Sequence, residues 1–135
     1  VCVEASESRV LQGAEPTPSA HGLLGISAGI PLPFVEQLAP GLPFAPGSRG
    51  IIDEFVGVSS SEGAAMSKKL ATMEGLLVGP SSGAACHAAL MVAKRPEMCG
   101  KTVVVIFPSS GERYLQHPMF DRLREEAKQA LPQCN

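Results

Sequence analysis

The run Thr102–Phe107 constrains the fold more than any other feature of this sequence. Its residues, Thr-Val-Val-Val-Ile-Phe, are β-branched or apolar throughout and do not alternate with polar residues. Such a run is typical of a strand covered on both faces, as in a parallel sheet between helices. A helix predicted over Ala84–Ala93 precedes it, is apolar almost all round, and cannot continue past Pro96. We therefore expect a buried strand in an α/β fold.

The remaining pattern alternates strand and helix. Short apolar runs predict three further strands, Val1–Glu4, Ile51–Val58 and Leu76–Val78. The capping-box pattern from Ser59 to Glu62 predicts a helix start, and Gly75 stands where a left-handed C-terminal cap is expected. Apolar residues predict the inner faces of this helix and of a last one: Met66, Leu70 and Met73, then Met119, Leu123, Ala127 and Ala130. This order predicts a three-layer, open, mainly parallel sheet with helices on both faces.

Length and composition indicate one folded domain. The chain has 135 residues, of which 44% are hydrophobic and 18% charged, and its net charge is −2. This balance provides no basic surface for nucleic acid or an anionic membrane, so a small-molecule or protein partner is expected. The four cysteines form no CxxC pair, which favours reduced structural thiols and no metal site. The start at Val1 resembles no signal peptide, so we expect a cytoplasmic chain, an organellar form remaining an alternative, that begins in the middle of a fold.

Residues 31–50 interrupt the alternation of strand and helix. Prolines and glycines recur there in Pro31-Leu-Pro33, Ala39-Pro-Gly41 and Ala45-Pro-Gly47. Proline lacks the amide hydrogen that a helix interior or central strand requires. The segment is therefore predicted to be a surface insertion into one partial domain that covers residues 1–135.

The segment Gly79–Ala85 is the most informative candidate site. It follows a predicted strand and opens a predicted helix, and parallel sheets bind ligands at the carboxyl ends of their strands. Ser81 or Ser82 could simply cap the helix, whereas free amides and hydroxyls at a helix start could also hold a phosphate. No GxxxxGK[ST] or GxGxxG motif supports the phosphate alternative. From the residues alone, this is a contact for a small polar ligand of unknown identity.

Seven motifs in order resemble the cysteine synthase (O-acetylserine sulfhydrylase) family. The resemblance spans nearly the whole chain apart from the insertion, and its motifs are Glu4–Ser8, Gly25–Gly29, Val58–Ser60, Glu74–Gly79, Ser81–Ala85, Ala93–Pro96 and Phe107–Leu115. It implies the C-terminal part of a fold-type-II enzyme, in which lysine-bound pyridoxal 5'-phosphate lies between two α/β domains. The implied reaction makes L-cysteine from O-acetylserine and sulfide by β-replacement.

The resemblance also assigns site residues. The first serine of the Ser-Ser-Gly motif, here Ser81, hydrogen-bonds the pyridine nitrogen in this family. A neutral hydroxyl beside a positive helix end does not favour a protonated pyridinium, so the ring is a weaker electron sink, which suits β-replacement. Gly25, Ile26 and Ser27 resemble the family's Gly-Ile-Gly loop, which faces cofactor and substrate. Ser27 and Ile30 depart from that pattern, and Ser27 puts the fit of the substrate in doubt.

Other parts of the family's site are missing from this sequence. Its catalytic lysine, substrate loop and phosphate cradle all precede the matched region, so no catalytic residue is assigned in this chain. The five lysines are expected to be solvated or packed only along their stems: Lys68, Lys69, Lys94, Lys101 and Lys128. The chain is accordingly predicted to be inactive without an N-terminal domain, and the complete protein to be a homodimer that pairs with serine acetyltransferase.

Two classes of alternative remain. Cystathionine synthase and serine or threonine dehydratases share the fold and a related site. A shortened paralogue could instead be a non-catalytic binding module that pairs with full-length subunits. The sequence does not distinguish a truncated gene model from a true short protein.

Overall fold

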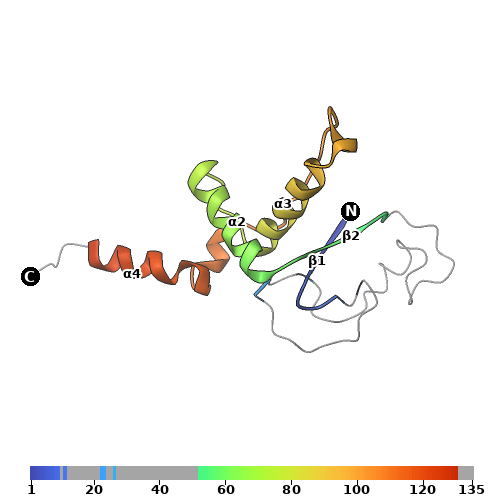
Figure 1. Ribbon diagram of the computed structural model, residues 1–135. Coiled ribbons are helices and arrows are strands. Elements are labelled where there is room, and N and C mark those ends of the chain that lie inside the picture. Colours follow the sequence, from blue (N-terminus) through green and yellow to red (C-terminus); the bar gives the residue numbers. More distant parts are fainter. Residues whose placement is uncertain (10, 12–21, 24–25, 27–51, 131–135) are drawn as a thin grey trace, which may run out of the picture.

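The computed structural model describes residues 1–9, 11, 22–23, 26 and 52–130 (Figure 1). Gly25, Ser27 and the predicted insertion at residues 31–50 lie outside the described residues. The longer elements are β1 (Cys2–Ala5), β2 (Phe55–Val58), α2 (Ser60–Met73), α3 (Pro80–Ala93) and α4 (Asp121–Ala130). The short 3-10 turns within residues 52–130 are η2 (Pro96–Met98), η3 (Gly111–Tyr114) and η4 (Pro118–Phe120).

The strands β1 and β2 form a parallel pair, which confirms the α/β class. Val3 pairs with Val56 and Ala5 with Val58, and the Ser6 amide extends the ladder by donating to the Val58 carbonyl at 3.0 Å. Helix α3 covers this sheet, and its residues share one apolar core with the strands: Ala5, Leu23, Val56, Val58, Ala84, Ala88 and Val92. The apolar face of α3 therefore lies where a parallel sheet needs it.

Helix α2 begins at the predicted capping box. The Glu62 amide donates to Ser59 Oγ at 3.3 Å, and the Ser59 amide donates to Glu62 Oε2 at 2.9 Å. The Ser59 hydroxyl and the Ser59 amide both donate to the Glu62 carboxylate, and these two hydrogen bonds lower the pKa of that carboxyl. Gly75, with a φ of +70°, follows the helix as predicted, because a left-handed residue there suits glycine.

The predicted inner face of α2 is partly wrong. Gly63, Ser67 and Leu70 are buried, whereas Met73 is 72% exposed. Small residues turn inward because α3 approaches too closely for larger side chains. A β-carbon added at Gly83 would overlap the Gly63 carbonyl oxygen and lie 2.7 Å from the Ser67 amide nitrogen. In Figure 1 the two helices accordingly diverge from a contact near their N-terminal turns.

Two predicted strands do not form in the described part of the chain. Thr102–Phe107 has no paired strand there, and Val104 and Ile106 are 85% and 78% exposed. In Leu76–Val78, only Val78 pairs, in an isolated antiparallel bridge to Ser110. A strand needs a neighbour to accept its backbone hydrogen bonds, and the described residues provide none beside Thr102–Phe107.

An ion pair joins the segment just after α3 to the residue before β2. Arg95 forms a bidentate ion pair with Glu54 at 2.7 and 2.6 Å, and this hydrogen bonding holds the pKa of the Glu54 carboxyl below its usual value. Helix α4 projects away from the sheet (Figure 1), and none of its residues is buried. Among the described residues, no helix is long and apolar enough to cross a membrane.

The substitution Gly83→Ala is expected to destabilise the fold. Helix propensity alone favours alanine by about 1 kcal/mol, but the new methyl group meets the α2 backbone, which cannot rotate away. We expect a net loss of about 1–3 kcal/mol in urea unfolding followed by circular dichroism. Ala65→Ser, which adds one atom at an exposed position of α2, is the control and should stay within about 0.5 kcal/mol. Equal or greater stability of Gly83→Ala would contradict the packing argument.

Candidate functional site

The first turn of α3 places two serines differently. Gly79 is the N-cap and Pro80 the first helical residue, so Ser81 and Ser82 lie inside the helix and neither caps it. The Ser82 hydroxyl donates to the Ser109 carbonyl at 3.3 Å, and the Gly79 amide donates to the same carbonyl at 3.1 Å. Ser82 thus connects the first turn of α3 to the backbone at Ser109. Its hydroxyl is occupied by that contact, so Ser81 is the better candidate to bind a ligand.

The wall opposite α3 is built by residues 108–114. Ser109 Oγ and the Tyr114 hydroxyl are 3.2 Å apart, and the Gly111 amide donates to the Leu77 carbonyl at 2.9 Å. A β-carbon added at Gly79 would overlap the Tyr114 ring and lie 2.8 Å from Ser109 Oγ. Glycine at position 79 therefore lets the aromatic ring pack directly on the backbone that starts the helix.

A cavity of about 310 Å³ lies between these walls. Its lining residues are Val3, Ile26, Ser81, Ala85, Ile106, Pro108, Ser109 and Tyr114. Ser81 is only 7% exposed. The structure thus brings together two of the residues that the sequence singled out, Ser81 and Ile26, at the amino end of a helix. The other two, Gly25 and Ser27, lie outside the described residues.

Sequence reasoning assigned no role to three of these lining residues, Pro108, Ser109 and Tyr114. They belong to the motif Phe107–Leu115, which carries part of the family resemblance. A usable signal existed, because the motif follows a predicted parallel strand and so falls at the same sheet edge as Gly79. The contact between Tyr114 and Gly79, by contrast, depends on a turn that no local pattern predicts.

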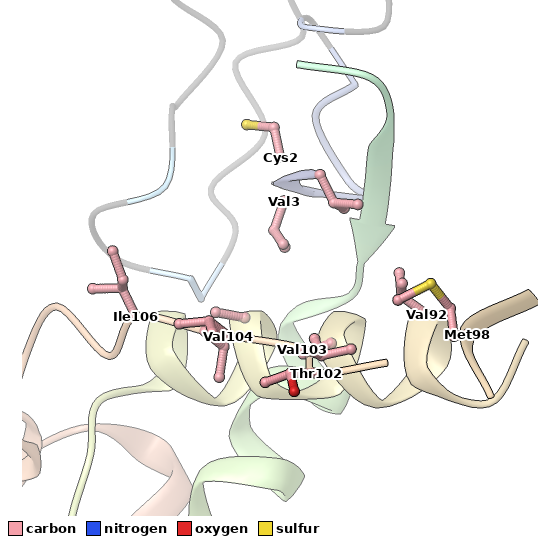
Figure 2. Close-up of a pocket in the computed structure, with 12 residues that line it drawn as sticks. Cys2, Val3, Val92, Met98, Thr102, Val103, Val104 and Ile106 are labelled. Carbon is pink, nitrogen blue, oxygen red and sulfur yellow. The ribbon is translucent and has the colours of Figure 1, made fainter. Parts of the chain in front are cut away.

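An apolar groove of about 590 Å³ adjoins the cavity and shares Val3, Ala85 and Ile106 with it. Its other lining residues are Val1, Cys2, Ala89, Val92, Met98, Thr102, Val103, Val104 and Val105. Figure 2 shows the labelled side chains from β1 on one side and from the segment 102–106 along α3 on the other. Burial raises the pKa of the Cys2 thiol, and the nearby Glu4 carboxylate adds to this effect. The groove is thus suited to apolar contact.

The electrostatics of the cavity favour an uncharged contact. Among the described residues, its lining contains hydroxyls and apolar groups but no lysine, arginine, aspartate or glutamate. Nor does the described part of the chain place any group of three His, Cys, Asp or Glu side chains to hold a metal ion. A neutral hydroxyl beside apolar and aromatic side chains can bind a flat ring that carries one hydrogen-bonding atom.

Known proteins with similar sequences identify the family of this chain. Residues 2–109 match the model of the family described as pyridoxal-phosphate dependent enzyme. The chain belongs to this family. It is 40% identical over 122 residues to a cysteine synthase of Staphylococcus aureus and 38% identical over 132 residues to cysteine synthase A of Salmonella typhi.

Solved structures show the same fold. The crystal structure of a cysteine synthase from Entamoeba histolytica is similar with a TM-score of 0.70 and 36% identity over 87% of this chain. An O-acetylserine-dependent cystathionine β-synthase from Helicobacter pylori is similar with a TM-score of 0.68 and 40% identity. The chain is therefore a partial domain of a fold-type-II pyridoxal-phosphate enzyme.

These matches cover most of this chain but little of its relatives. The Staphylococcus aureus match includes 89% of this chain and 34% of the relative's length. The two crystal structures are covered to 31% and 33%. The chain thus spans about a third of the length of the proteins it resembles.

The substitution Gly79→Ala is expected to displace Tyr114 from the cavity wall. Tyr114 is the only tyrosine and the sequence has no tryptophan, so intrinsic fluorescence reports on this ring alone. Because the new methyl group would overlap the ring, acrylamide quenching should increase about twofold or more if the ring turns into solvent. Gly57→Ala, whose methyl group would meet Ser6 at an ordinary 3.5 Å, is the matched control. Unchanged quenching in Gly79→Ala would show that Tyr114 does not pack there.

Proposed function

We propose that this chain is the C-terminal part of a cysteine synthase, which makes L-cysteine from O-acetylserine and sulfide with pyridoxal 5'-phosphate. The observation that carries the proposal is the position of Ser81, which is buried in the first turn of α3 and lines a cavity with Ile26 and Tyr114. The identity of about 40% with proteins named cysteine synthase supports the choice of reaction. A cytoplasmic location is part of the same proposal.

The lining residues fit the ring of pyridoxal phosphate. Ser81 would hold the pyridine nitrogen through its neutral hydroxyl, beside the positive end of the α3 dipole. Ile26, Pro108 and Tyr114 would supply apolar walls that exclude water from the ring. When bound, the cofactor supplies an electron sink for the bonds at the substrate's α-carbon. A neutral partner for the ring nitrogen moderates this sink, which suits elimination and replacement better than transamination.

The same residues do not complete the site. In the part of the chain that the structure describes, the cavity lining includes no lysine to bind the cofactor and no cation to balance its phosphate. We propose that these groups come from the remaining two thirds of the relatives' length, so that this chain by itself is inactive. The homodimer and the pairing with serine acetyltransferase rest on the family resemblance alone.

The apolar groove supports a proposal for where that remaining part attaches. Residues 102–106 and residues of β1 line the groove together with residues of α3 (Figure 2). Val104 and Ile106 are exposed, and among the described residues no backbone pairs with Thr102–Phe107. We propose that an extended segment of the N-terminal domain lies here and joins the sheet.

The runner-up function is cystathionine synthesis. The Helicobacter pylori relative is described as an O-acetylserine-dependent cystathionine β-synthase and is 40% identical to this chain over the aligned region. The two reactions differ in the thiol that is accepted, sulfide or homocysteine, so assaying both acceptors distinguishes them. A serine or threonine dehydratase would need neither acceptor, and a non-catalytic binding module would bind full-length subunits without turnover.

The chain alone is expected to produce no cysteine, whereas adding the N-terminal domain should restore activity. Orientation of reacting groups contributes up to about 7–11 kcal/mol, and an unanchored cofactor on a surface lysine lacks that contribution. The measurement is cysteine formed from O-acetylserine and sulfide, with the cofactor present, by the chain with and without a co-expressed N-terminal domain. Turnover and stoichiometric cofactor binding by the chain alone would refute this proposal.

In the reconstituted enzyme, Ser81→Ala should lower kcat/KM about 10-fold or more, as expected for a lost hydrogen bond in a buried site. Ser81→Asp should shift the cofactor absorbance toward that of a protonated pyridinium, because a carboxylate stabilises the positive ring. Ser82→Ala is the matched control: it removes the neighbouring hydroxyl, which contacts Ser109 and does not line the cavity. If Ser81 and Ser82 variants behave alike, Ser81 has no special contact with the ring.

A further inference from the structure

His117 lies outside the cavity lining, yet both of its ring nitrogens are engaged. Nδ1 accepts a hydrogen bond from the Met119 amide at 3.2 Å, and Nε2 lies 3.2 Å from the Gly22 carbonyl oxygen. An amide can only donate, so Nδ1 carries a lone pair, and the proton of the neutral ring is on Nε2. His117 therefore donates from Nε2 to Gly22 while it caps the turn η4.

Gly22 is held from two sides by these contacts. Its amide donates to Ser60 Oγ at 2.8 Å, and its carbonyl accepts from His117. The next residue, Leu23, is fully buried, and its carbonyl accepts a hydrogen bond from the Ile26 amide at 3.3 Å. Ile26 in turn lines the cavity with Ser81. Contacts therefore lead from His117 to one wall of the cavity.

The backbone of His117 leads to the opposite wall. Its amide donates to the Tyr114 carbonyl at 2.7 Å, and Tyr114 lines the cavity. The turn is further supported by Arg124, whose Nη1 donates to the Leu115 carbonyl at 2.6 Å and to the His117 carbonyl at 3.3 Å. His117 is thus joined to Tyr114 through its backbone and to the Ile26 wall through its side chain.

We propose that His117 is a positioning residue that holds the two walls of the Ser81 cavity at a fixed separation through its Nε2 hydrogen bond to Gly22. It touches none of the reacting groups. Its effect is to fix where Ile26 stands relative to Tyr114, and hence the width available to a ring beside Ser81. The inference rests on the proposed function only in taking this cavity as the ligand site.

Two substitutions separate this role from simple capping. Glutamine is not among the favoured caps, but its longer side chain can place an amide donor near the Gly22 carbonyl, so His117→Gln keeps the proposed contact. Asparagine is a good cap, but its side chain is too short to replace Nε2, so His117→Asn keeps the contact with Met119 and loses the one with Gly22. Positioning and capping therefore predict opposite outcomes for the pair.

The experiment measures amide hydrogen exchange of Gly22 and Ile26 by NMR in the chain joined with its N-terminal domain. We expect His117→Asn to raise exchange at both amides roughly fivefold, the factor for losing one hydrogen bond of about 1 kcal/mol. His117→Gln should match the wild-type protein. Amides within α3 serve as the internal reference that each variant is folded.

The reverse order, with asparagine like wild type and glutamine loosened, would assign His117 to capping alone and overturn the proposal. Equal exchange in both variants, whether raised or unchanged, would also overturn it, since the two contacts would then not be separable. None of these readouts requires turnover. A failure of the proposed reaction would leave the exchange pattern intact, so the two failures are distinguishable.

Discussion

The close contact between α2 and α3 at Gly63 and Gly83 determines how the rest of the structure is arranged. Because neither position has room for a β-carbon, the first turn of α3 can lie against α2 in only a narrow range of positions. Helix α2 starts directly after β2, so this contact also fixes α3 relative to the end of the sheet. Ser81 lies in that first turn. The position of the candidate site is thus set by backbone packing between two helices.

Features that depend only on residues close together in the sequence could be predicted from it. The capping box at Ser59, the left-handed Gly75 and the end of α3 before Pro96 all follow from local stereochemistry. The inward face of α2 could not be predicted, because it depends on how closely α3 approaches. The pairing of Thr102–Phe107 depends on residues distant in sequence. The composition of this segment predicts that a strand there can be covered on both faces, but not which segments cover it.

The residues of the candidate site also differ in whether local sequence could predict them. Ser81 and Ile26 were predicted from motifs, and the structure places both on one cavity, although the assignment of Ser81 to the cofactor remains a proposal. That Ser81 is not a cap could have been predicted as well, because proline favours the first helical position and so marks Gly79 as the cap. Tyr114 and His117 could not, since their roles come from contacts with residues far away in the sequence, Gly79 and Gly22.

The unpaired apolar surface links the stability of this chain to its chemistry. Covering a valine or isoleucine side chain stabilises a fold by about 1.5–3 kcal/mol, and Val104 and Ile106 are both largely exposed. Because a whole domain is stable by only about 5–15 kcal/mol, an N-terminal segment that covers these side chains would change the stability of the chain substantially. Ile106 also lines the Ser81 cavity. The segment proposed to complete the sheet would therefore close one side of the cavity at the same time, so that the site becomes enclosed only when the fold is complete.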